Sequence, residues 1–415
     1  MFFNEIKTLF KIKAFRNLYI ALFIDSSGKW FSFIGVYMLV YELTGSALSI
    51  VFTIIARRLP QAIFGVIGGY VADHYDKRWI LILCHFFSAV ITGSILFVTQ
   101  SEHMWVIYIS GFFLSLSSTV FTSCRTAAVY EIVPNERIKM AHSFLYTTQT
   151  IPMIFGAVLA GVLYPIVGIK ILIVINILTF FISAAMILPI KSIKKTVHNK
   201  IQETFIKKMT AGWNKVFQTP LLNRLFIYNI LATVAFCVHP LMMTIYPLKL
   251  YNMGSGGVGI FNALYGLGTV MSALVVAKLT SKQTSFIEKI RPILLVLSGA
   301  FLVLISLTSF KVYAMVLFCI SIVFFMIFFL NQENIKIVHS GQQHVGRVSG
   351  LDLTAQIIIF TIFNPIYGKV ADIFDTHYIG IIAGVFLIIF PPILELFFKY
   401  KSVQETYLAP KEAVI

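Results

Sequence analysis

The chain has 415 residues, of which 58% are hydrophobic and 12% are charged, and its mean hydropathy is +0.87. An ordinary soluble chain is about 45–50% apolar and about 25% charged. Because so few charges cannot cover a water-exposed surface, this composition excludes a cytosolic enzyme, a nucleic-acid-binding domain and a disordered chain. It predicts an all-α integral membrane protein with several helical spans.

Apolar windows, each near the ~20 residues that a bilayer crossing takes, predict twelve transmembrane helices in two groups of six. The first group is predicted at residues 17–41, 47–71, 79–99, 104–126, 142–165 and 169–190. The second group is predicted at residues 223–249, 257–279, 291–310, 312–334, 350–371 and 377–399. The sequence therefore predicts an N-terminal six-helix bundle at 1–190, a linker at 191–222, a C-terminal bundle at 223–400 and a tail at 401–415.

The linker between the two groups is basic, with seven lysines and the single acid Glu203. Its apolar residues, from Ile201 to Phe217, recur at helical spacing. Such a segment is typical of an amphipathic helix that lies in the membrane interface with its lysines in water.

The net charge of +16 is explained by where the basic residues fall. If the N-terminus is cytoplasmic, 25 of the 33 Lys and Arg lie in the termini and cytoplasmic loops, four lie on the opposite side, and four lie inside helices. Lys and Arg are enriched in cytoplasmic loops. The asymmetry predicts a multi-pass protein of the cell membrane with both termini in the cytoplasm.

The segment between the second and third predicted helices carries a recognisable motif. It reads Gly68-Gly69-Tyr70-Val71-Ala72-Asp73-His74-Tyr75-Asp76-Lys77-Arg78-Trp79. With this segment the sequence resembles the major facilitator superfamily, whose members carry Gly-x-x-x-Asp-(Arg/Lys)-x-Gly-(Arg/Lys)-(Arg/Lys) here. Gly69, Asp73, Lys77 and Arg78 match the pattern, whereas His74 and Asp76 depart from it.

The variant with Asp73 followed by Asp76-Lys77-Arg78 resembles the branch that contains macrolide efflux proteins and the enterobactin exporter. Two further stretches support this branch: residues 41–48, which read YELTGSAL, and Gly346-Arg347-Val348-Ser349. The resemblance implies two six-helix bundles, alternating access, and export of a small molecule in exchange for protons.

The charges of the motif predict a conformational latch between the two halves of the protein. Its predicted members are Gly69, Asp73, Asp76, Lys77 and Arg78, with the glycines allowing close helix approach. The alternative is that Lys77 and Arg78 only fix the topology.

Ionisable residues at bilayer depth are costly and usually face a cavity or a partner. Asp25 and Lys29 lie one helical turn apart on one face. The remaining mid-depth cations are Arg57, Arg58 and Arg125, and Asp25 is the only mid-depth acid. Because adjacent helical residues point about 100° apart, Arg57 and Arg58 cannot both meet the same partner.

This surplus of cations predicts a cavity that binds an anion, and a carboxylate-type siderophore fits it best. The predicted substrate-binding residues are Lys29, Arg57, Arg58, Gln61 and Arg125. Asp25, Glu131 and Glu333 are the predicted proton-coupling acids. An alternative pairs Asp25 with Lys29 and Glu131 with Arg125, which leaves these charges a structural role only.

Two other substrate classes remain open on the same fold, namely a macrolide or multidrug cation and a lysophospholipid. The chain has no Gly-x-x-x-x-Gly-Lys-(Ser/Thr) loop, no His-Glu-x-x-His and no Gly-x-Ser-x-Gly motif, so no nucleotide, metal, cofactor or catalytic residue is predicted. The expected partners are a siderophore-like anion, protons and the lipid bilayer. The chain is expected to act as a monomer, without nucleic acid.

Overall fold

The computed structural model describes residues 8–191, 213–279, 286–340 and 345–408, and these residues form helices and no strand. The predicted interfacial helix of the linker falls mainly on residues 192–212, which lie outside the described residues. The chain divides into two compact units, of which the first comprises Met1–Ile201 with Leu241–Gly266 and the second comprises Gln202–Pro240 with Leu267–Ile415.

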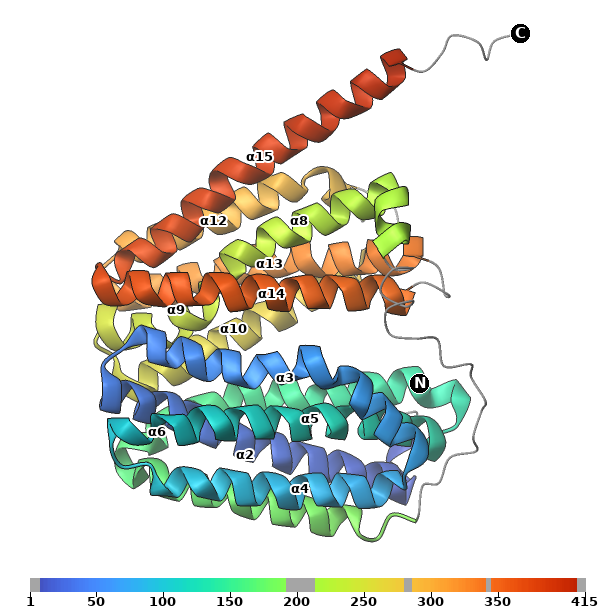
Figure 1. Ribbon diagram of the computed structural model, residues 1–415, viewed down its shortest axis with the longest axis vertical. Helices are drawn as coiled ribbons and strands as arrows, with labels where there is room; N and C mark the ends of the chain where they lie inside the picture. The colour runs from blue at the N-terminus through green and yellow to red at the C-terminus, as the bar shows by residue number, and fades with distance from the viewer. Residues whose placement is uncertain (1–7, 192–212, 280–285, 341–344, 409–415) are drawn as a thin grey trace. The chain divides into compact units, whose positions relative to one another are not determined.

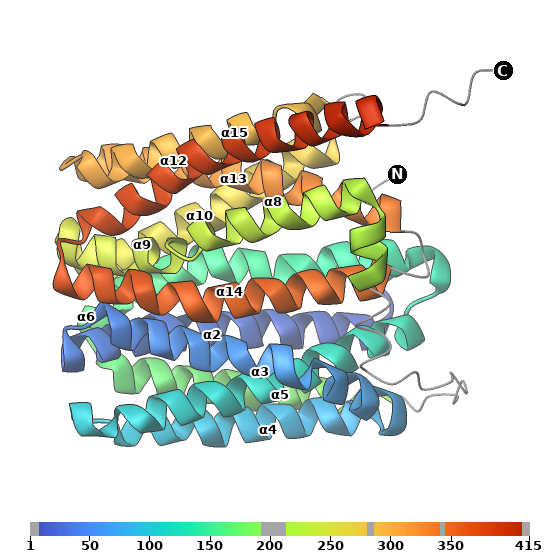
Figure 2. The same ribbon diagram turned by 45° about the horizontal axis from the view of Figure 1, so that its top comes forward.

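The first unit contains the helices of the N-terminal part of the chain (Figure 1). They are α2 (Lys13–Thr44), α3 (Ala47–His74), α4 (Lys77–Ser94), α5 (Met104–Ile132) and α6 (Ile138–Ile187), joined by most of α9 (His239–Ile245), the π-helix at Tyr246–Leu250 and the first half of α10 (Gly254–Ala277). Figures 1 and 2 both show α5 between α3 and α4, and α5 packs against each of them.

The second unit is built from the later helices. They are α8 (Pro220–Phe236), the rest of α10, α12 (Arg291–Leu307), α13 (Lys311–Ser340), α14 (Val345–Ile373) and α15 (His377–Leu408). In both views α12 runs beside α15, and these two helices pack closely along their length.

Glycine and proline determine where the long helices bend. The fifth and sixth predicted spans are joined directly in α6, and the break between them is Gly168, whose φ of 70° lies in the left-handed region. Glycine adopts this conformation without the steric penalty of a side chain. The seventh predicted span is divided between α8 and α9 at Cys237-Val238, just before Pro240, which cannot continue the hydrogen-bond ladder of a helix.

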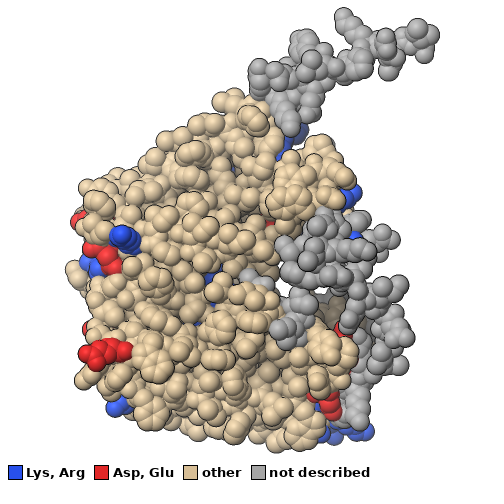
Figure 3. Space-filling model, in the orientation of Figure 1, with Lys and Arg blue, Asp and Glu red and all other residues tan. Residues whose placement is uncertain are grey.

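Most of the outward-facing side chains are apolar. The face in Figure 3 is tan over most of its area, and its blue and red atoms lie mainly at the left and right edges. Large apolar side chains such as Leu83, Phe86 and Val90 are more than half exposed. Among the described residues, eight helices are long and apolar enough to cross a membrane, by length and composition. The chain is therefore a helical membrane protein, and the count of twelve spans stays a prediction.

Lys336, which was counted with a cytoplasmic loop, lies in a helix. The tenth predicted span ends at residue 334, but α13 continues to Ser340, so Lys336 belongs to this helix and is 5% exposed. The apolar window ends before the helix does, because Lys336 and the neighbouring Glu333 lower the hydropathy of a helix that continues.

Close approach of α12 and α15 depends on Gly299 and Gly384. A Cβ atom on Gly299 would lie 2.6 Å from the carbonyl oxygen of Gly384, and a Cβ atom on Gly384 would lie 2.5 Å from that of Gly299. Small residues at such a crossing allow the two backbones to pack directly.

We expect Gly299→Ala to destabilise the protein by about 1–3 kcal/mol, because the added methyl group must push the two backbones apart. The measurement is the thermal unfolding of the purified protein in detergent. Gly350→Ala in α14 is the matched control, since no described heavy atom lies within 4 Å of the position of its Cβ. An equal loss of stability in both variants would contradict the packing role of Gly299.

Candidate functional site: a cationic cavity in the first unit

Two adjoining chambers lie inside the first unit. The larger, of about 510 Å³, is called here the Arg125 chamber and is lined by residues of α2, α3, α5 and α6. The smaller, of about 280 Å³, is called the serine chamber and is lined by residues of α2 to α6. The residues that line both chambers are Lys29, Trp30, Gln61, Ser118 and Phe121. The two chambers are therefore neighbours, and together they are called the N-terminal cavity below.

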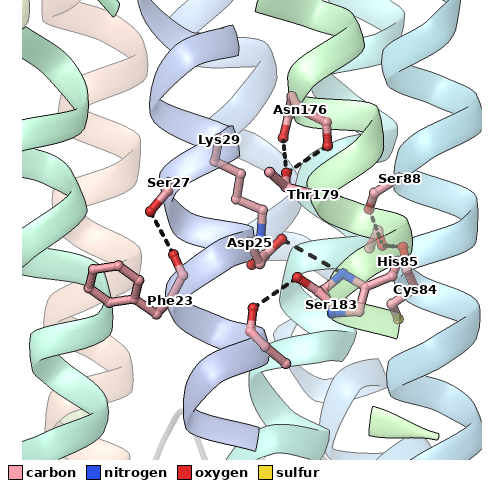
Figure 4. A network of polar contacts seen from close by, with 12 residues as sticks. Phe23, Asp25, Ser27, Lys29, Cys84, His85, Ser88, Asn176, Thr179 and Ser183 are labelled. Carbon is pink, nitrogen blue, oxygen red and sulfur yellow. Dashed lines mark hydrogen bonds and ion pairs between the residues drawn. The ribbon is translucent and has the colours of Figure 1, made fainter. Parts of the chain in front are cut away.

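A charged cluster of Asp25, Lys29 and His85 lies on the wall of this cavity (Figure 4). Lys29 and Asp25 are neighbours on α2, and the ammonium Nζ donates a hydrogen bond to Asp25 Oδ2 at 2.7 Å. His85 comes from α4, and its Nδ1 lies 3.7 Å from Asp25 Oδ1. Asp25 and His85 are almost fully buried, whereas the side chain of Lys29 is 41% exposed. Lys29 is therefore the member of the cluster that a ligand can reach.

Aromatic rings surround the ammonium group of Lys29. Its Nζ lies 5.6 Å from the ring centre of Phe121 and 5.8 Å from that of Phe180. The His85 ring packs edge-on against Phe121 at 4.8 Å. Apolar rings keep the dielectric constant low around a charge pair, so the interaction of Lys29 with Asp25 is stronger here than it would be in water.

The structure separates the two adjacent arginines of α3. Arg57 lines the serine chamber, where its guanidinium lies 5.8 Å from the ring centre of Phe33. Arg58 is exposed and lines neither chamber. The sequence predicts that the two differ, and the structure indicates that Arg57 is the one at the cavity.

The other two predicted substrate residues also lie on the cavity wall. Gln61, one turn beyond Arg57 on α3, lines both chambers, and Arg125 of α5 lines the larger one. Four of the five predicted residues thus surround one space: Lys29, Arg57, Gln61 and Arg125. They face a single acid, Asp25, which already holds Lys29.

Several buried polar atoms on the cavity wall have no hydrogen-bond partner among the described residues. They are Arg57 Nε, His85 Nε2, Thr92 Oγ1 and Ser115 Oγ. A buried polar group without a partner costs about 1–3 kcal/mol. Water or a polar ligand in the serine chamber would satisfy these atoms, so the chamber suits an oxygen-rich molecule.

The predicted latch residues lie towards the end of α3 and at the start of α4, and Asp76, Lys77 and Arg78 contact residues of the first unit. Asp76 is the N-cap of α4, where its carboxylate accepts a hydrogen bond from Arg78 N at 3.0 Å. Lys77 is fully buried and pairs with Glu131 of α5 at 2.9 Å. Arg78 donates a hydrogen bond to the carbonyl oxygen of Leu188. Lys77 and Arg78 thus connect α4 to the ends of α5 and α6.

The remaining latch residues, Gly69 and Asp73, are exposed on α3. No described heavy atom lies within 4 Å of the position of a Cβ on Gly69, so this glycine does not provide the expected close helix approach. Gly68 provides it, because a Cβ there would lie 2.6 Å from Ser123 Oγ. The two neighbouring glycines could not be distinguished in the sequence.

Two of the predicted proton-coupling acids are paired in ways that the sequence did not predict. Glu131 pairs with Lys77 rather than with Arg125. Glu333 of α13 accepts a hydrogen bond from Lys336, which also pairs with Asp352 of α14. Of the three predicted acids, only Asp25 lines the N-terminal cavity.

Sequence reasoning missed His85 and the hydroxyl groups of the serine chamber. The chamber is lined by Ser32, Ser88, Thr92, Ser115, Ser117 and Ser118. A signal for them was present, since the window 104–126 carries four serines from Ser115 to Ser123. Serines within a transmembrane helix usually mark helix contacts, and their lining of a cavity required the fold.

The two residues of the Lys77–Glu131 pair should differ in how much their replacement destabilises the protein. We expect Glu131→Gln to destabilise the protein by about 3–5 kcal/mol, because it leaves a buried ammonium without a counter-charge. Lys77→Met should destabilise it less, since the side chain of Glu131 is 29% exposed and is hydrated when unpaired. Thermal unfolding in detergent measures both. A larger loss for Lys77→Met, or no recovery in the double variant, would show that this pairing is not the source of the stability.

Comparison with known proteins agrees with the motif. The family model described as Major Facilitator Superfamily matches residues 18–356. Macrolide efflux protein A of Streptococcus pyogenes is 23% identical over 276 residues, which are 64% of this chain and 65% of that protein. The uncharacterized MFS-type transporter YfiS of Bacillus subtilis (strain 168) is 27% identical over 165 residues, 40% of this chain and 39% of that protein. These matches span less than two thirds of either relative.

Solved structures with the same fold are distant in sequence. A POT family transporter in complex with 5-aminolevulinic acid has a TM-score of 0.75 at 12% identity, covering 93% of this chain and 96% of that one. The nucleoside transporter NupG has a TM-score of 0.73 at 14% identity, covering 93% and 99%. A bacterial homologue of the iron transporter ferroportin has a TM-score of 0.72 at 12% identity, covering 94% and 99%. At these identities the likeness shows the fold alone.

The family match covers most of the chain, and it includes the loop motif from Gly69 to Arg78 and the whole N-terminal cavity. The resemblance predicted from that motif is confirmed: this chain is a multi-pass membrane transporter that belongs to the major facilitator superfamily.

Proposed function

We propose that this transporter exports a small anionic metabolite of the carboxylate-siderophore type, by alternating access and in exchange for protons. We further propose twelve spans, both termini in the cytoplasm, a place in the cell membrane and action as a monomer. The observation that carries the substrate class is the charge of the N-terminal cavity, where Lys29, Arg57 and Arg125 face one acid.

The cavity supports a carboxylate ligand through geometry as well as charge. Arg57 lines the serine chamber and Arg125 lines the neighbouring chamber, so a ligand that extended through both chambers would meet both residues. Guanidinium groups bind carboxylates in a bidentate manner. Lys29 adds a third donor that is already partly exposed. The hydroxyl groups of the serine chamber then offer neutral hydrogen bonds to the remaining oxygens of the ligand.

Membrane energetics favour outward movement of an anion. The cytoplasm is electrically negative, and each elementary charge that moves down the membrane potential contributes about 2.3 kcal/mol per 100 mV. An anion that leaves and a proton that enters both move in this favourable direction. The export therefore needs no nucleotide hydrolysis.

Exchange of the ligand for a proton requires that binding of the proton does not strengthen binding of the ligand. Protonation of Asp25 would remove the negative charge beside Lys29, and the freed ammonium would bind an anion more tightly. For an anionic ligand, Asp25 therefore regulates how available Lys29 is. If the proton and the anion are exchanged by competition, the proton must bind at a site other than the Asp25–Lys29 pair.

Export of a macrolide is the second candidate, because the names of the relatives from Streptococcus pyogenes and Enterococcus faecalis specify macrolide efflux. A cationic macrolide would compete with Lys29 and with protons for Asp25, which gives exchange directly. The three cations of the cavity oppose this candidate, since they repel a positively charged ligand.

A lysophospholipid would need a lateral opening to the bilayer. An apolar groove on α4 and α5 shares Cys84 and Ser117 with the serine chamber. These two residues form the wall between groove and chamber, and Ser117 Oγ donates a hydrogen bond to the carbonyl oxygen of Cys84 at 3.1 Å. The groove and the chamber share these two residues only, so this candidate ranks third.

The arginine pair offers a matched test of the anionic substrate. We expect Arg57→Gln to weaken binding of citrate, used as a tricarboxylate probe, by roughly tenfold to a hundredfold, because one charge-assisted hydrogen bond contributes about 1.5–3 kcal/mol. Arg58→Gln is the control with the same chemistry at a position outside the cavity. Tryptophan fluorescence of the purified protein measures binding, and siderophore secretion by expressing cells measures export. Equal, mild effects of both changes would overturn the anionic proposal.

Asp25→Asn distinguishes the first two candidates. If the ligand is an anion, loss of the carboxylate frees Lys29, and citrate binding should strengthen on the order of tenfold. If the ligand is a macrolide cation, the same change should abolish erythromycin binding and resistance. Weaker citrate binding by Asp25→Asn would show that Asp25 does not compete for Lys29.

A further inference from the structure

The second unit contains a buried charge cluster that the cavity of the first unit does not use. Lys336 of α13 lies at its centre, with Nζ 2.5 Å from Asp352 Oδ2 of α14 and in contact with Glu333 of α13. Asn229 of α8 donates from Nδ2 to Asp352 Oδ2 at 3.0 Å, and Gln356 of α14 donates to the same oxygen at 3.3 Å. Three helices thus meet at one carboxylate.

The cluster has one negative charge more than it has positive charges. Glu333 and Asp352 are acids, Lys336 is a cation that contacts both of them, and Asn229 and Gln356 are neutral. Asp352 and Asn229 are 2% exposed, and the side chain of Lys336 is 6% exposed. The side chain of Glu333 is 26% exposed, so Asp352 is the acid of the cluster that is buried. A buried carboxylate is expensive in a membrane helix unless a cation or a proton neutralises it.

Two oxygens of this cluster have no partner. Asp352 Oδ1 and Asn229 Oδ1 are buried without a hydrogen bond to any described residue. Both belong to side chains that are joined by the hydrogen bond from Asn229 Nδ2 to Asp352 Oδ2. A carboxylate oxygen beside an amide oxygen is the type of ligand that hard cations and protons prefer.

The charged residue of α8 and Arg291 of α12 have other partners. The only charged residue of α8 is Arg224, which is paired with Glu395 of α15. Arg291 of α12 lies next to Glu288 and packs on the ring of Tyr228. Lys336 is the cation that pairs with Asp352 in the structure.

We propose that Asp352, with Glu333 and Asn229, is the coupling-ion site of this transporter, where a proton or Na⁺ competes with the ammonium group of Lys336. This inference rests on the proposed function in one respect, namely that export is coupled to an ion. It deepens that function, because a site in the second unit allows a cation to be exchanged without strengthening anion binding at Lys29. The coupling ion and the anion then bind to separate groups.

Removal of the tethered ammonium should expose the site to free cations. We expect Lys336→Met to gain a dependence on Na⁺ or on pH that the wild type shows weakly. In detergent, replacing choline chloride by NaCl at constant ionic strength should raise its melting temperature by about 3 °C or more if the ion is Na⁺. If the ion is a proton, the same rise should follow a lower pH and not depend on Na⁺.

Matched variants separate this effect from a general loss of charge. Lys278→Met removes an exposed lysine of the second unit and should respond to Na⁺ and pH as the wild type does. The double change Lys336→Met with Asp352→Asn should lose the gained dependence. A Lys336→Met protein that behaves like Lys278→Met in both titrations would overturn the proposal.

Asp352→Asn alone provides a second test that does not depend on the folding of Lys336→Met. Citrate binding should stay within about twofold of wild type, because the N-terminal cavity is intact, while uptake of citrate into inverted vesicles driven by an imposed pH or Na⁺ step should be lost. Ion-driven uptake at the wild-type rate would overturn the proposal. Absence of citrate binding in the wild type would instead contradict the anionic substrate, and the melting-temperature arm would still test the ion site.

Discussion

The high energy of an uncompensated charge in hydrocarbon is the constraint on which this structure depends. The outward-facing side chains are largely apolar, so each charge inside a helix needs a partner or a cavity. Lys77 meets Glu131, Lys29 meets Asp25, and Lys336 meets Asp352. Each pair joins an ammonium to a carboxylate, but only the pair at Asp25 opens onto a cavity that the structure describes. The pair at Lys77 thus joins α4 to α5, whereas the pair at Lys29 lines a cavity.

Local sequence rules predicted the parts of the site that lie within one helix. Asp25 and Lys29 are four residues apart, and the structure pairs them as helical geometry requires. The difference between Arg57 and Arg58 followed from the 100° between adjacent residues, but which one faces the cavity depends on how α3 is rotated against its neighbours. The helices themselves follow the apolar windows closely, since windows of this length have few other ways to satisfy the backbone.

Contacts between helices could not be read from the sequence. His85 reaches Asp25 from another helix, and nothing near either residue in the chain indicates the partner. Glu131 was a candidate partner for Arg125 because both lie on α5. In the structure α4 packs against α5, and Glu131 pairs with Lys77 instead. Lys336 lies just beyond the apolar window 312–334 and was therefore counted with a loop, and its pairing with Asp352 of α14 depends on the fold. In each case the partner comes from a helix that only the fold brings near.

The two units differ in the sign of the charge that they leave uncompensated. In the first unit the cations Lys29, Arg57 and Arg125 exceed the acid Asp25, and this surplus attracts an anion. In the second unit the acids Glu333 and Asp352 exceed Lys336, and this surplus attracts a cation. An anion therefore compensates the surplus charge of the first unit only, and a cation compensates that of the second unit only. If both sites held their ions in a single step, the charges would cancel and the membrane potential would contribute little. Alternate occupation makes each step move charge in the favourable direction, which is what exchange of an outgoing anion for an incoming cation requires.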